Sequence, residues 1–226
     1  KASAGGGLKD KFNNEAMINF FKSKRKIAAF GTMSNTGQTG LNWQDSRKYG
    51  ITEDNFEYDE NSGFFYSFAE NDAFEFNGNG LPKAWTGGLH FSNKWNEDKH
   101  NFNASYMYKK LDVAGDGETR TQYILPDTLY YINQRNASFS QRDRNTLNGK
   151  YEIQLDSSSS LKFVFSGYKG HTETSSIFHS EALNEHSGPV NTSNRKTSNK
   201  NQESSLNTSI IYRKKLKKNS RTIHDR

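Results

Sequence analysis

The sequence predicts an all-β protein whose strands form one antiparallel up-and-down meander. Apolar and polar residues alternate with a period of two, and successive side chains of a strand point to opposite faces. Helical periodicity is nearly absent. Short connections alternate strictly with long polar stretches, a pattern typical of strands that pair with their neighbours in the chain.

The composition excludes several classes of protein. Of the 226 residues, 31% are hydrophobic, too few for an α/β enzyme with a buried parallel sheet. Aromatic residues make up 13%, which argues against intrinsic disorder. The lack of cysteine removes disulfides, thiolate catalysis and zinc–thiolate sites. No apolar run of about 18 residues is present, so a membrane helix is excluded, whereas membrane β-strands need no such run.

The charge pattern does not favour nucleic acid as a partner. The net charge of +6 is spread along the chain, whereas a nucleic-acid-binding surface is usually a dense basic stripe. The densest basic run, residues 213–218, has no interleaved aromatic platform for stacking bases. It is predicted to be a solvated turn.

Seven segments carry the strand pattern, the first two loosely and the other five cleanly. In chain order they are residues 14–22, 27–35, 85–92, 101–109, 147–155, 161–168 and 206–213. In the segment 147–155, Tyr151 and Ile153 share the apolar face and Lys150 and Glu152 the polar face. Ile211 breaks the polar face of the last segment.

The connections are of two kinds. Short turns are predicted at residues 23–26, 96–100, 156–160 and 216–220, and long polar loops at about 36–82, 112–138 and 171–202. Small hairpins are expected inside the loops, between residues 63–68 and 73–76 and between residues 119–125 and 128–132. A meander then carries its short turns on one side and its long loops on the other, as bacterial outer-membrane barrels do.

A soluble β-sandwich also has one apolar and one polar face per strand. Strands of about ten residues, the lopsided connections, and aromatic residues near strand ends favour a transmembrane β-barrel segment instead. Those aromatic residues include Trp85, Trp95, Phe102 and Tyr212. The alternatives that remain are a soluble adhesion or carbohydrate-binding module and a structural outer-membrane barrel that transports nothing.

Several strings resemble the barrel domain of TonB-dependent-receptor-like outer-membrane proteins of Gram-negative bacteria. They are KASAGGG at residues 1–7, GTMSNT at 31–36, GLNWQDSRKYG at 40–50, GLPKAWTGGLHFSNKW at 80–95 and QYILPDTLYY at 122–131. The resemblance covers most of the chain and implies an outer-membrane location. It also implies solute binding and energised uptake, with a plug domain and the TonB system as partners of the parent protein.

The family's barrels have about 22 strands. About nine are expected here, counting the tail of a strand at residues 1–7 and a last strand that is cut short at the C-terminal end. We therefore expect residues 1–226 to be an N-terminal part of a barrel domain that is cut at both ends, without signal peptide or plug. The remaining strands and the missing plug of the parent chain, together with outer-membrane lipid, would be its partners.

The barrel hypothesis assigns the two faces of each strand. The apolar set is expected to face lipid and comprises Leu89, Phe91, Phe102, Tyr106, Tyr151, Ile153, Phe163, Phe165 and Ile210. The polar set is expected to face the lumen and comprises His90, Asn103, Ser105, Lys150, Glu152, Gln154, Lys162 and Asn207.

No catalytic, cofactor or metal site is predicted, and the chain is not expected to be an enzyme. His171, His179 and His186 share one expected loop, but their spacings fit no helical ligand pair and no compact carboxylate accompanies them. No nucleophile-elbow motif and no phosphate-binding loop is present. Exposed aromatic and Arg groups can anchor ligands, so an outer-loop recognition cluster is one interpretation of Trp43, Asp45, Arg47 and Tyr49. Packing of this loop against its neighbours is the favoured interpretation.

Overall fold

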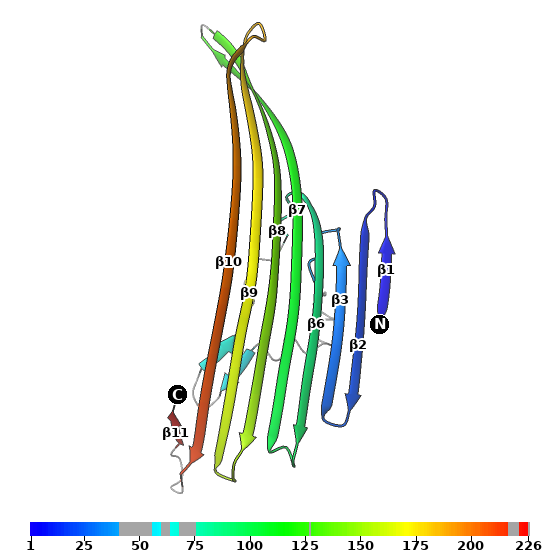
Figure 1. Cartoon of the computed structure of the whole chain (residues 1–226), viewed down its shortest axis with the longest axis vertical. Helices are drawn as coiled ribbons and strands as arrows, with labels where there is room; N and C mark the ends of the chain where they lie inside the picture. Colours follow the sequence, from blue (N-terminus) through cyan, green and yellow to red (C-terminus); the bar gives the residue numbers. More distant parts are fainter. Residues whose placement is uncertain (41–55, 60–63, 68–75, 127, 217–221, 226) are drawn as a thin grey trace.

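The alternating segments form strands, and each strand of the main sheet pairs with its neighbours in the chain. The computed structural model describes residues 1–40, 56–59, 64–67, 76–126, 128–216 and 222–225. Nine strands form one antiparallel sheet that is curved and not closed (Figure 1). In sheet order they are β1 (Ala2–Gly6), β2 (Phe12–Lys22), β3 (Arg25–Ser34), β6 (Leu81–Trp95), β7 (His100–Leu125), β8 (Thr128–Gln154), β9 (Ser159–Asn184), β10 (Pro189–Lys215) and β11 (Thr222–Asp225). The predicted all-β, up-and-down meander is confirmed.

A second, two-stranded sheet lies between β3 and β6 in the sequence. It pairs β4 (Phe56–Asp59) with β5 (Phe64–Ser67). β5 lies within the first predicted strand of the hairpin between residues 63–68 and 73–76, and its described partner is β4; residues 73–75 lie outside the described residues. In the described part of the chain, no helix is long and apolar enough to span a membrane.

Three of the predicted short turns lie at the same end of the sheet (Figure 1). Residues 23–24 join β2 to β3, residues 96–99 join β6 to β7, and residues 155–158 join β8 to β9. Asn96 and Asp98 have positive φ angles of 55° and 65°, a left-handed conformation that Asn and Asp tolerate better than most residues. The three predicted turns at these positions are confirmed.

Two of the three predicted long loops are wrong, because residues 112–138 and 171–202 lie almost entirely in strands. β7 and β8 stay in register from His100 opposite Ile153 to Leu125 opposite Thr128, and β9 and β10 pair along nearly their whole length. These strands are 26 or 27 residues long. Polar sequence does not end a strand, since the backbone ladder continues whatever the side chains are. The predicted hairpin of residues 119–125 and 128–132 is confirmed as the far end of β7 and β8.

Two aromatic rings cover glycines on neighbouring strands. The Phe165 ring of β9 lies over Gly149 of β8, its direct cross-strand partner, and the Phe30 ring of β3 lies over Gly88 of β6. A Cβ added at either glycine would collide with the ring. Such pairs favour one register, because a shift would separate the ring from the gap that receives it.

The turn between β8 and β9 holds an ionised carboxylate. Asp156 Oδ1 accepts hydrogen bonds from the Ser158 backbone N–H at 2.7 Å and from the Ser158 hydroxyl at 2.8 Å. These bonds, the hydroxyl's first, lower the pKa of Asp156 from 3.8 to about 2, because they stabilise the charged form. Since the folded-state pKa is depressed, the carboxylate's contribution to stability is present above the ordinary pKa and is lost as the pH falls through the folded value.

We expect the Asp156→Asn variant to unfold more easily than the parent at neutral pH, with a difference that shrinks as the pH falls from about 4 to about 2. Unfolding free energies measured as a function of pH check this. In an NMR titration, Ser158→Ala should return the pKa of Asp156 toward 3.8. A native Asp156 that titrates at its ordinary pKa contradicts the assignment.

Candidate functional site

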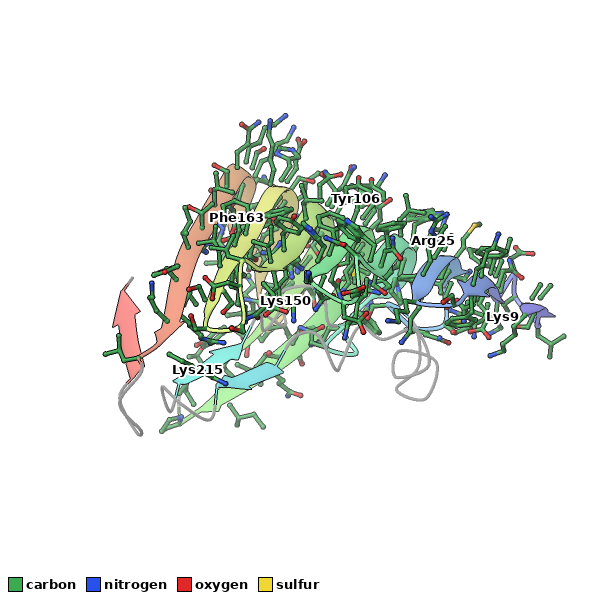
Figure 2. All side chains as sticks on the ribbon, turned by 90° about the horizontal axis from the view of Figure 1, so that it is seen from below. Lys9, Arg25, Tyr106, Lys150, Phe163 and Lys215 are labelled. Carbon is green, nitrogen blue, oxygen red and sulfur yellow. The ribbon has the colours of Figure 1, made fainter. Side chains whose placement is uncertain are left out.

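The curved sheet separates the two predicted sets of side chains. Residues directly opposite each other in an antiparallel pair share a face, and the pairing of β6 through β10 is unbroken across the middle of the sheet. All nine residues of the apolar set lie on one face and all eight residues of the polar set on the other. Tyr106 and Phe163 lie on the convex side and Lys150 on the concave side (Figure 2).

The convex face is apolar and uncovered. Ile18, Leu89 and Ile210 have exposed fractions of 74%, 58% and 58%, and Phe163 is 37% exposed. No second layer of the described residues covers Phe163 or Tyr151, whereas in a β-sandwich these side chains would form the core. The apolar face therefore has no protein partner in the described part of the chain.

The apolar residues on the convex face form a band with charged borders. On β9 the band runs from Leu161 to Gly167, and Lys169 follows it. On β7 it ends at Tyr108, before Lys110. On β6 its last residue away from the turn at residues 96–99 is Trp85, and Lys83 lies beyond it. We call the region between these borders the apolar band.

The band is slanted relative to the strands. Residues that are paired across neighbouring strands form a register row, and successive rows on one face are two residues apart. On β3 and β6 the upper border lies at Met33 and Trp85. On β8 and β10 it lies at Leu147 and Leu206, two rows nearer to the turns at residues 96–99 and 155–158. Two rows are four residues, roughly 13 Å along a strand, and five strand spacings from β3 to β10 are roughly 24 Å. The band therefore crosses the strands as if they were tilted by about 30°, close to the tilt of roughly 35–45° in outer-membrane barrels.

An aromatic row lies at the lower border of the band. The Trp95, His100 and Tyr151 rings are stacked, with the Trp95 and His100 centroids 5.2 Å apart. His100 Nδ1 and the Tyr151 hydroxyl are hydrogen-bonded at 2.7 Å. Tyr212 lies in the same register row as His100. Rings with a polar tip are the side chains that membrane–water interfaces favour.

A second aromatic row lies at the upper border. The Trp85 ring faces Lys110, whose Nζ is 5.3 Å from the ring centroid. The Tyr106 hydroxyl donates a hydrogen bond to Asn145 Oδ1 at 2.7 Å. On β6 the two rows are ten residues apart, from Trp85 to Trp95, or roughly 33 Å along the strand and about 29 Å in height at the 30° tilt of the band. That height is comparable with the apolar belt of an outer-membrane barrel, about 25 Å.

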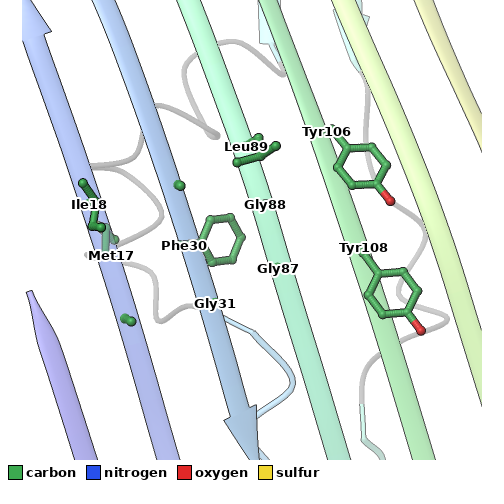
Figure 3. Close-up of a pocket in the computed structure, with 11 residues that line it drawn as sticks. Met17, Ile18, Phe30, Gly31, Gly87, Gly88, Leu89, Tyr106 and Tyr108 are labelled. Carbon is green, nitrogen blue, oxygen red and sulfur yellow. The ribbon is translucent and has the colours of Figure 1, made fainter.

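A shallow recess indents the convex face where glycines replace side chains. Its volume is about 350 Å³, and Gly31 and Gly87 form part of its floor, flanked by Ile18, Leu89 and Tyr106 (Figure 3). The flanking side chains are apolar apart from the tyrosine hydroxyls. The recess is thus continuous with the apolar band.

The concave face is more buried, and it combines polar side chains with buried apolar ones. The buried apolar residues on this face are Met17, Ala28, Phe30, Ala84, Leu111 and Ile211. His90 and Lys162 are only 7% and 5% exposed. Lys162 Nζ lies 3.6 Å from Glu152 Oε1, and the Ser166 hydroxyl donates to Asn148 Oδ1 at 2.7 Å. Buried charges and amides are tolerated here because each has a polar neighbour.

A second charged group lies farther along the concave face. The Arg144 guanidinium lies 4.5 Å from the centroid of the Tyr168 ring and 3.8 Å from Glu203 Oε2. Lys109 is its direct cross-strand partner on β7, and Arg142 is two residues along β8. Sequence reasoning missed Arg142 and Arg144 because they lie between the predicted loop at about 112–138 and the predicted strand at 147–155. The polar-face residues of β8 are even-numbered. Continuing this alternation from Lys150 toward lower residue numbers would have placed Arg144 and Arg142 on the same face.

Beyond the band, β7 to β10 continue as a four-stranded ribbon. β7 extends 15 residues past Lys110, roughly 50 Å along the strand and about 43 Å in height at the 30° tilt of the band. The far end of the β7–β8 hairpin carries a stacked pair of rings, Tyr123 and Tyr130, with centroids 4.6 Å apart. Both faces of the ribbon are rich in Ser, Thr, Asn and charged residues.

The other predicted site residues are not brought together. Trp43, Asp45, Arg47 and Tyr49 lie outside the described residues. His171 and His179 lie on β9 and not in a loop, and His186 lies in the turn that precedes β10. His179 Nδ1 is hydrogen-bonded to Asn194 Oδ1 at 2.7 Å. Among the described residues, no three His, Asp or Glu side chains form a group suited to a metal ion.

Comparison with known proteins does not assign the chain to a family. No protein-family model and no curated protein matches the chain. A function therefore has to be inferred from the geometry of the two faces.

Proposed function

We propose that the chain is part of an outer-membrane β-barrel of the TonB-dependent-receptor-like kind, whose parent protein binds a solute and carries it across the outer membrane. The single observation that carries the proposal is the apolar band on the convex face, which on β6 is about 29 Å high between two aromatic rows. In this arrangement the band contacts lipid, the concave face lines the lumen, and the turns at residues 23–24, 96–99 and 155–158 lie at the periplasmic end.

Membrane embedding explains why apolar side chains are exposed. Exposed Ile, Leu and Phe side chains over seven strands would make a soluble protein prone to aggregation, whereas in hydrocarbon they are in a matching solvent. Hydrocarbon also requires every backbone N–H and C=O to be paired. The outer edge of β1, and the part of the outer edge of β10 that β11 does not cover, therefore require further strands, which close the barrel in the parent protein.

The solute pathway follows from the same arrangement. The concave face carries hydroxyl, amide and charged groups, which bind hydrated solutes and line a water-filled lumen. The resemblance supplies the energised part of the proposal, in which a plug opens under force transmitted from the inner membrane. The strands of this chain supply the wall and not the moving parts.

Spin labelling of single-cysteine variants tests the proposal, and the lack of native cysteine in these 226 residues simplifies it. The full protein is reconstituted in phospholipid vesicles, with a label at Ile210 or Phe163 on the convex face and at Asn207 or Lys162 on the concave face. We expect oxygen, which concentrates in lipid, to relax the convex labels more strongly. A water-soluble nickel complex should relax the concave labels more strongly.

Equal accessibility of the two faces to both reagents would overturn the proposal. So would a parent protein that remains soluble without detergent and melts cooperatively in water. Fractionation of cell envelopes on a density gradient provides the matching check in cells, where the protein is expected with the outer membrane.

A further inference from the structure

Two basic residues face each other at the lower border of the apolar band. Lys22 ends β2 and Arg25 begins β3, and the two are direct cross-strand partners beside the turn at residues 23–24. Both side chains are exposed, and Arg25 lies on the same side of the sheet as Tyr106, the convex side (Figure 2). Like charges directly opposite each other destabilise a sheet, so an anion that lies between them would relieve the repulsion.

A phosphate group suits this pair of cations. The guanidinium of Arg25 can donate two parallel hydrogen bonds to phosphate oxygens, and the ammonium of Lys22 adds a compact positive charge. Arg25 lies one register row from Trp95, which belongs to the lower aromatic row. Such aromatic rows mark the membrane–water interface, so the pair lies at the level of lipid headgroups. In the neighbouring turn, the Asp98 carboxylate is bound by Lys24 at 2.6 Å, which offsets its negative charge.

An apolar path leads from the cation pair to the recess in the convex face. On β3 this face continues with Ile27, Ala29 and Gly31. Ala29 and Gly31 are small, whereas Ile18 of β2 and Leu89 of β6 rise on either side of Ala29 (Figure 3). The path therefore ends in a depression that is walled by apolar side chains.

The length of the path matches an acyl chain. Arg25 and Gly31 are six residues apart on β3, roughly 20 Å along the strand and about 17 Å in height at the 30° tilt of the band. Half of the hydrocarbon core, which one leaflet occupies, is about 15 Å thick. A phospholipid whose phosphate lies at the cation pair therefore reaches the recess with the end of one acyl chain.

We propose that the convex face of β2, β3 and β6 binds one anionic phospholipid, with its phosphate between Lys22 and Arg25 and one acyl chain in the recess. This inference rests on the proposed function, because it needs the convex face to contact lipid. It goes further by naming the class of lipid and the residues that select it. A zwitterionic lipid such as phosphatidylethanolamine fits less well, because its ammonium group would meet the same two cations.

Binding of phosphatidylglycerol to the full protein in an uncharged detergent tests the headgroup site, with phosphatidylethanolamine of the same acyl chains as the reference lipid. We expect phosphatidylglycerol to bind about tenfold more tightly than the reference. The double variant Lys22→Gln/Arg25→Gln should weaken phosphatidylglycerol binding about tenfold. The matched control Lys169→Gln/Lys196→Gln removes two charges from the convex face far from the turns and should change the affinity less than about twofold.

A second variant tests the acyl-chain site. Gly31→Leu fills the recess from its floor, and its Cβ has room because the nearest atom would be the Thr86 carbonyl oxygen at 4.0 Å. The variant should weaken the binding of phosphatidylglycerol with full-length chains about tenfold. Short-chain phosphatidylglycerol, whose chains end before the recess, should bind the parent and the variant with the same affinity.

Equal affinity for the two headgroups, or equal loss in the two double variants, overturns the inference, because headgroup charge would then not select the lipid at this pair. An unchanged affinity of Gly31→Leu for the full-length lipid also overturns it. So does displacement of the lipid by an equal concentration of inorganic phosphate, because the pair would then bind a free anion. These outcomes differ from failure of the proposed function, which is measured separately by the spin-label accessibilities. Circular dichroism of each variant shows whether the fold is retained.

Discussion

Replacement of Phe163 by arginine is expected to destabilise the membrane-embedded protein by about 2–4 kcal/mol, the cost of an arginine on the lipid face near the bilayer midplane. Phe163 lies near the middle of the apolar band on β9, directly opposite Tyr151 and Ile210, and its ring is 5.9 Å from that of Phe165. An arginine there would place a guanidinium in hydrocarbon with no acidic partner in its register row. Urea titration of the full protein in phospholipid vesicles measures the change.

The neighbouring residue provides the control. Lys162 lies on the opposite face of the same strand, beside Glu152, so Lys162→Arg retains the positive charge in a polar environment. Its effect on the free energy of unfolding should be small. Equal tolerance of arginine at residues 162 and 163 would argue against the assignment of the convex face to lipid.

Replacement of Gly149 by valine is expected to destabilise the protein by about 1–3 kcal/mol, the usual cost of forcing extra methyl groups into a packed site. The first added carbon would collide with the Phe165 ring, which lies over the Gly149 backbone. The ring must then leave its position between β8 and β9. Chemical denaturation in the same vesicles measures the loss.

A double-mutant cycle distinguishes this collision from a general intolerance of glycine replacement. Phe165→Ala removes the ring, so Gly149→Val should cost much less in that background than in the parent. Gly117→Val is the matched control, because Gly117 lies in β7 with open space where its Cβ would be. Identical costs for Gly149→Val in both backgrounds would show that the ring does not restrict residue 149.

The sequence was informative wherever one face of a strand is apolar. Across 147–155 and 161–168 the alternation fixes both the strand and the face of each side chain, and the structure agrees. Above the band both faces of β7 to β10 are polar, so the period-two signal disappears although the ladder continues. The loops predicted for residues 112–138 and 171–202 were wrong for this reason.

The candidate site was predictable in part for the same reason. Lys150, Glu152 and Lys162 alternate with apolar residues and were placed on the polar face by sequence alone. Arg142 and Arg144 lie just beyond the band, where no apolar neighbour marks their face. Only the register with Leu111 and Lys109 of β7 assigns them to the concave wall.

The unbroken pairing of β7 with β8 has a mechanical consequence. A continuously hydrogen-bonded hairpin of this length is stiff. Tyr123 and Tyr130 are therefore held at a fixed distance from the apolar band, whereas an unpaired loop would let them move through a larger volume. A partner that binds this tip meets a pre-ordered surface, so little conformational entropy of the hairpin is lost on binding. The same stiffness allows a force applied at the tip to be transmitted along the paired strands to the part of the hairpin that carries the apolar band.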